Sequence, residues 1–456
     1  MSGIKNIFEI AKNSLFAHQT AINVTGQNIA NANTDGYTRK TANFIPSVTL
    51  LGDKLSLGSG VHINEIQRTR DLYIDNQLNF QKQGMSYWKT MDSKHAILEQ
   101  VFEEPGETGL SSVMNAFFES WYELSNNPDN TSVRDNVIFH GDALAQKFNY
   151  LNERFANLQN EISSEISQTV DDFNNYGGQL AEINKKLVYV TKEGEGYSNL
   201  LDKRDKLIGK MHEIMDISTR ENELGQVNIM FAGKVFVQKN QFIAIDPSNQ
   251  GANLSNLNWT DGSSTSMPDG GQLGALNKFL TDIIPDNKNK LNELATGLVD
   301  AINTAHQAGY GLDGSTGVNF FDDSSVDAYS IKINSELLTN NQMLAASGDG
   351  QGGSGANALV LAKLQDELSM SGNTMTFTSY YADMVSNEGY LKRESANLLE
   401  SQELFVNSLY TYQQSISGVS IDEEMTNLIK FQRGYQAAAQ MITVADELTE
   451  TIINMI

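Results

Sequence analysis

Two apolar seams with heptad-like spacing, one at each end of the chain, constrain the fold more than any other feature. Spacings of four and three residues connect the members of the first seam, which are Ile4, Phe8, Ala11, Leu15, His18, Ile22, Thr25 and Ile29. Glu424 and Thr449 interrupt the second seam, which contains Ile421, Leu428, Phe431, Tyr435, Ala438, Ile442, Ala445, Ile452 and Ile456. A repeat of seven residues requires a partner helix. We therefore expect the two ends of the chain to pair as a coiled coil.

The charges of the two segments are compatible with this pairing. Residues 1–45 contain more Lys and Arg than Asp and Glu, whereas residues 417–456 contain more Asp and Glu. Opposite net charges favour parallel and antiparallel pairing equally, so the sequence leaves the orientation open. The alternative interpretation is that both segments are ordinary amphipathic helices on the surface of a globular body.

The middle of the chain has the periodicity of long helices. We expect helices over residues 66–101, 108–124, 133–190, 273–306, 356–368 and 380–417. The longest of these has apolar residues at spacings of three and four, and Gly177-Gly178 is a candidate break or kink within it. After Pro285 the sequence contains no proline, so no proline interrupts the helices predicted there.

A short part of the sequence has the pattern of β structure. Residues 226–238 alternate around a candidate turn at Gly233-Lys234, which predicts a hairpin, and residues 241–245 are a candidate strand. We expect a loop over residues 249–271, a short strand at Ile331–Ile333 and a flexible linker over residues 348–355.

The expected fold is mainly α with a small β part. Residues 1–45 and 417–456 would form the two halves of a coiled-coil inner domain. Residues 46–216 and 272–416 would form a long helical bundle, with a short outer insertion near residues 310–355. Residues 217–271 would form a small inserted β subdomain that contains the hairpin.

Composition and charge argue against several classes of partner, covalent link and targeting segment. The chain has 32 Lys and Arg against 56 Asp and Glu, a formal net charge of −24, so nucleic acid and anionic membranes are poor partners. It contains no Cys, which excludes disulfides and thiolate metal sites. Glu9 and Lys12 interrupt the N-terminal apolar residues, so we expect no cleaved signal peptide, and no segment is apolar enough to insert into a membrane.

No set of residues has the spacing of a catalytic or metal site. The six His are isolated from one another, and none lies in a metal-binding motif. Residues 352–356 resemble a nucleophile elbow but end in Ala356, and the segment around Lys234 lacks most of a phosphate-binding loop. The Asp-Gly turns at residues 312–315 and 347–350 lack the spaced ligands of a calcium loop. We therefore expect no metal, no cofactor and no enzymatic activity.

A polar turn follows the N-terminal seam. Asn28–Arg39 reads Asn-Ile-Ala-Asn-Ala-Asn-Thr-Asp-Gly-Tyr-Thr-Arg. Its Asn residues compete for the hydrogen bonds of the helix backbone, and Asp35-Gly36 supplies a tight turn. This stretch resembles the signature of flagellar rod, hook and hook-associated proteins, at the same position in the chain. The resemblance identifies candidate assembly residues: Asn28, Asn31, Thr34, Gly36, Tyr37 and Arg39.

Three further segments resemble the hook-associated members of this axial family. One is the C-terminal stretch 413–440, another is Asn199–Leu207, and the third runs from Gly271–Leu276 to Thr304–Tyr310. The resemblance thus covers nearly the whole chain. Larger members carry a sizeable β domain in the slot that residues 320–344 occupy here, so we expect a slim subunit.

The resemblance implies a structural protein of the bacterial flagellum that joins hook to filament. Such subunits leave the cell by the flagellar type III export system without a cleaved signal peptide and assemble helically. The implied partners are further copies of the chain, the hook protein, a second junction protein on the flagellin side, and an export chaperone at the C-terminal region. Alternatives are a hook or distal rod subunit of the same family, a helical surface adhesin, and an enzyme.

Overall fold

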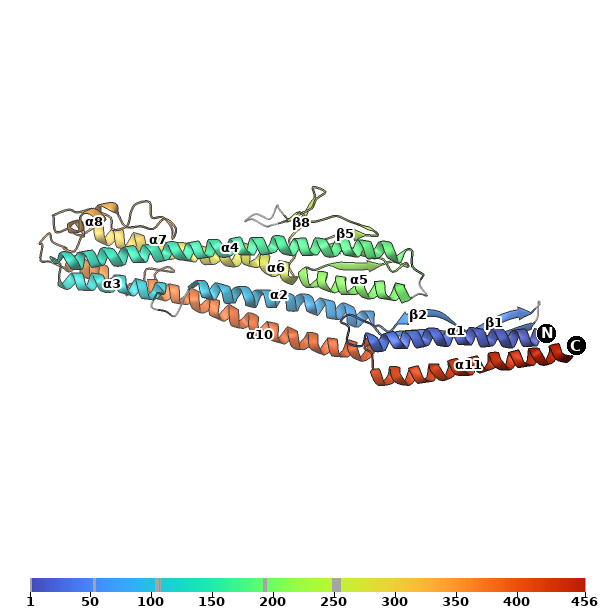
Figure 1. Cartoon of the computed structure of the whole chain (residues 1–456). Helices are drawn as coiled ribbons and strands as arrows, with labels where there is room; N and C mark the ends of the chain where they lie inside the picture. Colours follow the sequence, from blue (N-terminus) through green and yellow to red (C-terminus); the bar gives the residue numbers. More distant parts are fainter. Residues whose placement is uncertain are drawn as a thin grey trace.

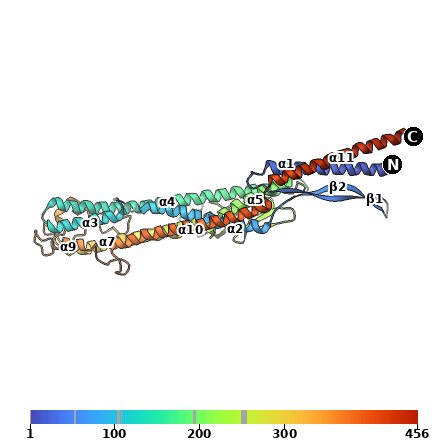
Figure 2. The same cartoon turned by 90° about the horizontal axis from the view of Figure 1, so that it is seen from below.

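The protein is an elongated rod with both termini at one end (Figures 1 and 2). The computed structural model describes residues 2–51, 55–102, 106, 108–191, 195–247 and 256–455. A narrow section carries the termini, and a longer helical bundle forms the rest of the rod. The prediction of a mainly helical chain with a small β part is confirmed, and the β part consists of small antiparallel sheets.

The two terminal helices form the narrow section. Helix α1 (Ser2–Ala30) lies against α11 (Ile421–Met455), and the two run antiparallel, so the structure decides the orientation that the sequence left open. Asn28, near the end of α1, is hydrogen-bonded to Glu424 in the first turn of α11. Ile456, the last member of the predicted C-terminal seam, lies outside the described residues.

A long β-hairpin also packs against α1. Strands β1 (Lys40–Leu51) and β2 (Leu55–Arg68) pair antiparallel, from Lys40 opposite Arg68 to Leu51 opposite Leu55. The sequence analysis did not predict this hairpin, which crosses the expected boundary at residue 45. Two features of the sequence hid the hairpin from a pattern-based prediction. Pro46 argues against a strand, and the apolar residues of the segment do not alternate regularly with polar ones.

Helices of 8 to 57 residues form the bundle. They are α2 (Leu72–Phe102), α3 (Leu110–Asn126), α4 (Thr131–Leu187), α5 (Glu195–Ile214), α6 (Gly271–Lys278), α7 (Ile284–Gln307), α9 (Ala356–Lys363) and α10 (Phe377–Ser417). A π-helical segment, Phe279–Ile283, connects α6 to α7. The predicted helix at 66–101 begins later, because residues up to Arg68 belong to β2.

Helix α4 extends over 57 residues and supplies much of the core. Its predicted apolar spacing places Leu144, Phe148, Leu151 and Phe155 inside the bundle. The expected break at Gly177-Gly178 is absent, because the helix continues through both glycines. Gly177 is needed for another reason: a Cβ there would lie 2.4 Å from Cε1 of Phe236.

The small β subdomain packs beside the second half of α4. Its antiparallel sheet has the order β3 (Ser218–Glu221), β4 (Val227–Phe231), β5 (Lys234–Gln238) and β6 (Gln241–Phe242). The hairpin turn is Ala232-Gly233, one residue earlier than expected, and both residues have positive φ. The expected loop contains a further strand pair, β7 (Asn256–Asn258) and β8 (Ser264–Ser266), and residues 249–255 of it lie outside the described part.

Turns and short helices cap the far end of the bundle. They include α8 (Ser335–Thr339) and a 3₁₀ turn at Asn341–Met343. Ile331–Ile333 does not form the predicted strand, since only an isolated bridge links Ile333 to Phe321. The expected linker 348–355 ends in a close contact, because a Cβ on Gly355 would lie 2.0 Å from the Ser125 carbonyl oxygen.

Candidate assembly site at the joint between the terminal helices and the bundle

Seven of the eight members of the N-terminal seam are buried or half-buried, and α1 is in contact with α11 and the β1–β2 hairpin. The seam's small or polar members Ala11 and Thr25 are buried, and Phe8 is exposed. Ile4, Leu15, His18, Ile22 and Ile29 are half-buried. The other buried positions of α1 are also short side chains, at Ala17, Ala21, Val24 and Asn28, because α1 has neighbours on two sides.

The C-terminal seam is less completely covered. Glu424, Ala438 and Ala445 are buried. Leu428, Phe431, Tyr435 and Ile442 are half-buried, and Ile421 and Ile452 at the ends of the helix are exposed. Glu424 contacts Asn28 and Phe431 contacts His18, so the face of α11 that carries these residues is directed at α1. Much of the rest of α11 remains in contact with solvent.

His18 occupies the middle of this contact. Its ring lies 5.6 Å from that of Phe44 on β1 and 6.3 Å from that of Phe431 on α11, measured between ring centroids. A Cβ at Gly434 would approach Cε1 of His18 to 2.5 Å, so the glycine makes room for the imidazole. Burial lowers the pKa of His18, which favours the neutral ring between the two aromatic side chains.

The signature turn ends α1 through local hydrogen bonds. The side-chain amide of Asn31 donates to the carbonyl of Gln27, and the Thr34 hydroxyl donates to Oδ1 of Asn31. Gly36 has a φ of 79°, a conformation that suits glycine. The turn therefore directs Tyr37 back toward the end of α1, where its hydroxyl donates 2.8 Å to Oδ1 of Asn28.

Asn28 connects three segments through one buried amide. Its Nδ2 donates to the Lys40 carbonyl at 2.8 Å and to Glu424 at 2.9 Å. Its Oδ1 accepts from the Tyr37 hydroxyl and from the Lys40 backbone amide at 3.0 Å. Every hydrogen-bonding position of this side chain is used, so the end of α1, the start of β1 and the start of α11 are held together.

Arg39 completes the connection to the C-terminal helices. Its guanidinium lies 2.9 Å from Oε1 of Glu424 through both Nε and Nη2, and 3.1 Å from Glu423. Its backbone amide donates to the carbonyl of Ser417, the last residue of α10. The Glu424 side chain is 3% exposed, so this is a largely desolvated ion pair.

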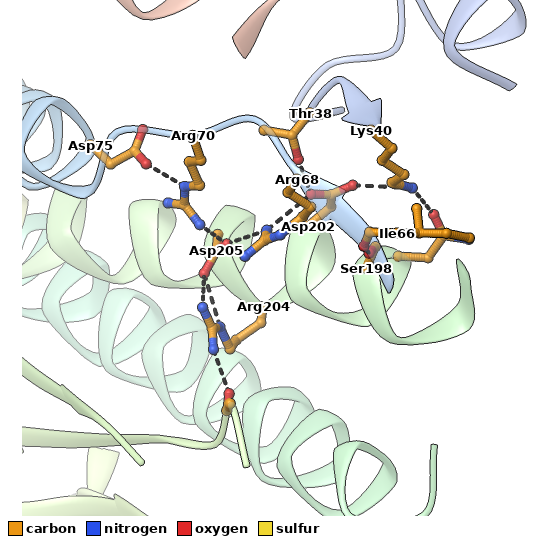
Figure 3. Close-up of polar contacts among 12 residues, drawn as sticks. Thr38, Lys40, Ile66, Arg68, Arg70, Asp75, Ser198, Asp202, Arg204 and Asp205 are labelled. Carbon is orange, nitrogen blue, oxygen red and sulfur yellow. Dashed lines mark hydrogen bonds and ion pairs between the residues drawn. The ribbon is translucent and has the colours of Figure 1, made fainter. Parts of the chain in front are cut away.

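An ion-pair network extends from the turn into the bundle (Figure 3). Asp202 and Asp205 on α5 face Arg68 at the end of β2, at 3.0 and 2.7 Å. Arg70 contacts Asp75 and Oδ2 of Asp205. Arg204 lies 2.8 Å from the other carboxylate oxygen of Asp205, Oδ1. Burial lowers the pKa of Arg70 and of Arg204, yet arginine remains charged at neutral pH.

The structure thus brings together two segments that resemblance had marked separately. The signature turn supplies Thr38, the residue directly after the turn is Lys40, and Asn199–Leu207 supplies Asn199, Asp202 and Asp205. The sequence analysis treated Glu424 as an interruption of the seam and missed its role as the anchor of Asn28 and Arg39. A polar residue in an otherwise apolar seam was the available signal, since such residues often fix pairing.

Within the described part of the chain, no three His, Asp, Glu or Cys side chains cluster in a way that could hold a metal ion. The search of the same residues for a helix both long and apolar enough to cross a bilayer also found no candidate.

Three protein-family models match this chain, one in the helical bundle and one at each terminal segment. A model described as the flagellar hook-associated protein FlgK helical domain matches residues 96–321. Residues 413–455 match the C-terminal model of flagellar basal body rod proteins FlgEFG, and residues 8–38 match the flagella basal body rod protein model.

Full-length relatives carry one name. Flagellar hook-associated protein 1 of Bacillus subtilis is 31% identical over 98% of this chain and 97% of its own length, and that of Escherichia coli is 24% identical over 99% and 100%. The fold is similar to that of the flagellar hook junction protein FlgK from Burkholderia pseudomallei, with a TM-score of 0.63 and 15% identity over 75% of this chain and 100% of that one.

Proposed function

Because this chain belongs to the flagellar hook-associated protein 1 family, and is a structural subunit of the bacterial flagellum at the hook–filament junction, we propose that it assembles there through its terminal helices. The subunits would form a helical ring in which α1 and α11 make the inner layer. The bundle would stand outside that layer, and the joint described above would set the angle between the two.

The apolar surface of α11 is the observation that carries this proposal. Its exposed side chains include Met425, Ile429, Val444, Leu448 and Ile453, although α1 already packs against this helix. Phe16 on α1 is 56% exposed as well. Apolar residues concentrated on a helix are stabilised by burial against other chains, and further copies of the same pair would supply that contact.

A junction requires different contacts on its two sides. We propose the hook protein as the partner on one side and a second junction protein, toward the flagellin, on the other. An open helical or ring assembly uses heterologous contacts of this kind, with unlike surfaces above and below each subunit. The rod-like shape, with the termini at one end, is consistent with stacking along a common axis (Figure 1).

Export by the flagellar type III system, without a cleaved signal peptide, is part of the same proposal, and it places the assembled chain outside the cell. An export chaperone would bind the C-terminal region, where exposed apolar side chains alternate with acidic ones such as Asp446, Glu447 and Glu450. The chain would work as a structural protein and not as an enzyme, as the nature of its relatives suggests.

The alternative within the family is a hook or distal rod subunit. The matches at residues 8–38 and 413–455 are to rod-protein models, so the terminal segments by themselves agree with that assignment too. The match to the helical domain over residues 96–321, together with the full-length relatives, favours the junction.

The experiment is electron microscopy of cells that lack this chain, with the medium blotted for flagellin. Finished hooks without filaments, together with flagellin in the medium, are the expected result. Missing hooks would instead indicate a hook or rod subunit, and normal filaments would exclude a role in flagellar assembly.

A further inference from the structure

The amine of Lys40 is buried at the joint. Lys40 is the first residue of β1, directly after the signature turn, and its side chain is 1% exposed. Its Nζ donates a hydrogen bond to Oδ1 of Asn199 on α5. The amide carbon of Asn199 is one covalent bond beyond that oxygen, so a nucleophilic amine and an electrophilic carbonyl are in contact away from bulk solvent.

A carboxylate stands beside this pair. Oδ2 of Asp202 lies 3.6 Å from Nζ of Lys40, on the next turn of α5 from Asn199. This oxygen is buried and accepts no hydrogen bond from any described residue. The other oxygen is held by the Thr38 hydroxyl and by Arg68 at 3.0 Å. One oxygen is therefore anchored, and the other faces the amine and can take a proton from it.

An aromatic ring closes the remaining side. Nζ of Lys40 lies 4.6 Å from the centroid of the Tyr37 ring, and the backbone of Lys40 is fixed by its two hydrogen bonds to Asn28. The amine is thus held on one side of the amide by groups that belong to the signature turn. Two reacting groups fixed in this way react far faster than the same groups free in solution. Figure 3 shows Lys40 and Asp202 directed toward each other.

We propose that Lys40 and Asn199 condense to an intramolecular isopeptide bond, with Asp202 transferring the proton. Asp202 would take a proton from the Lys40 ammonium, and the resulting neutral amine would attack Cγ of Asn199. The new Nζ–Cγ bond forms, Asp202 returns its proton to Nδ2, and the bond from Cγ to Nδ2 breaks, so that Nδ2 leaves as ammonia. The excess proton on Nζ passes to Asp202 and from there to the ammonia. The products are one amide bond and one ammonium ion, with no oxidant or other reactant required.

The bond would join the start of β1 covalently to α5, and therefore the terminal section to the bundle. It would form only once the turn and α5 have come together, so an unfolded chain would lack it. This inference rests on the geometry of the joint and holds whichever partners bind the assembled subunit.

Intact-mass measurement tests it on two samples, the purified full-length chain and the chain recovered from sheared flagella. The expected mass, in one or both samples, is that of the sequence less one ammonia. The peptide map should contain a branched peptide that joins the segments around residues 40 and 199, with no tryptic cleavage after Lys40. Unmodified peptides containing Lys40 and Asn199 in both samples would overturn the proposal.

Variants separate this bond from loss of ammonia elsewhere. Lys40→Arg keeps the positive charge but removes the reactive amine, and Asp202→Asn removes the proton acceptor, so both should retain the full sequence mass. Lys203→Arg, at an exposed position of the same helix, should behave as the wild type. Loss of ammonia that persists in Lys40→Arg would exclude Lys40 as the nucleophile. If the chain were absent from the flagella, the junction role would fail, while the mass of the purified chain would still decide the proposal.

Discussion

The carboxylate of Glu424 accepts a 2.9 Å hydrogen bond from the side-chain amide of Asn28, which lies 396 positions earlier in the chain. The same carboxylate is paired with Arg39. The end of α1 and the start of α11 are therefore bonded to each other where the narrow section meets the bundle. We call Glu424, with its contacts to Asn28 and Arg39, the anchor. Removing it should weaken the attachment of the terminal helices to the bundle more than removing an exposed contact of α11 does.

Glu424→Gln is expected to weaken that anchor. The substitution removes the buried one of the two carboxylates that pair with Arg39. Leaving a buried charge without any partner typically costs about 3–5 kcal/mol, and we expect a smaller loss of stability here because Glu423 remains 3.1 Å from Arg39. We expect few filaments per cell by electron microscopy. The control is Glu423→Gln, which removes the other carboxylate of Arg39 from a side chain that is 63% exposed and should leave filament number nearly unchanged. Equal filament numbers in both variants would argue against the anchor.

Tyr435→Asp tests the C-terminal seam. Tyr435 is half-buried on the face of α11 that meets α1, so a carboxylate there would be desolvated without a partner. We expect a folded bundle that does not enter flagella, as measured by circular dichroism of the purified chain and by blotting of sheared flagella. Gln436→Asp, at the exposed neighbouring position, should be incorporated normally. Normal motility with Tyr435→Asp would count against the seam.

The adjacent glycines of α4 should respond differently to substitution by alanine. Gly177→Ala places a Cβ 2.4 Å from the Phe236 ring and should lower the free energy of unfolding by about 1–3 kcal/mol. At Gly178 the nearest atom to a new Cβ is 3.5 Å away, so alanine should be neutral or stabilise the helix by up to about 1 kcal/mol. Denaturant unfolding of the two variants measures the difference, and similar midpoints would contradict the packing of Phe236 on Gly177.

His306 should make the bundle less stable as pH falls. Burial lowers its pKa to about 4 from 6.5, and its ring bridges the Val318 carbonyl and the Ala345 backbone amide in the neutral form. Between these two values the unfolded chain binds a proton that the folded chain does not, so the free energy of unfolding falls by about 1.4 kcal/mol per pH unit as pH decreases.

Unfolding curves at several pH values between 7 and 4 test this dependence. His306→Gln should be less stable at neutral pH, because it loses part of the bridge, but its stability should fall less steeply with decreasing pH. The exposed His62→Gln is the matched control and should keep the slope of the wild type. An unchanged slope in His306→Gln would show that other groups cause the dependence.

The terminal helices should be less protected before assembly than after it. Among the described side chains of α11, only Glu424, Ala438 and Ala445 are buried in the single chain, and a helix gains most of its stability from packing. We expect fast amide hydrogen exchange over residues 2–30 and 421–455 in the free chain and slow exchange in isolated flagella, with α4 protected in both. Strong protection of the terminal helices in the free chain would contradict ordering on assembly.

Local sequence patterns were sufficient to predict much of the fold. The seams locate α1 and α11, the spacing of Leu144, Phe148, Leu151 and Phe155 locates α4, and alternation locates the hairpin of β4 and β5. The asparagines and Gly36 of the signature predict where α1 ends. These features depend on neighbours a few residues apart, and the order of residues records such relations directly.

Only the tertiary structure decided how distant segments meet. The antiparallel pairing of α1 with α11, the partners of Glu424 and the approach of Lys40 to Asn199 join residues that no local periodicity relates. The Gly177-Gly178 pair predicts a break in the helix. In the structure the helix continues, and Gly177 is the position where the Phe236 ring packs closely against it. The sequence determines which residues can be buried, whereas the pairing of buried charges and amides depends on which surfaces fit together in space.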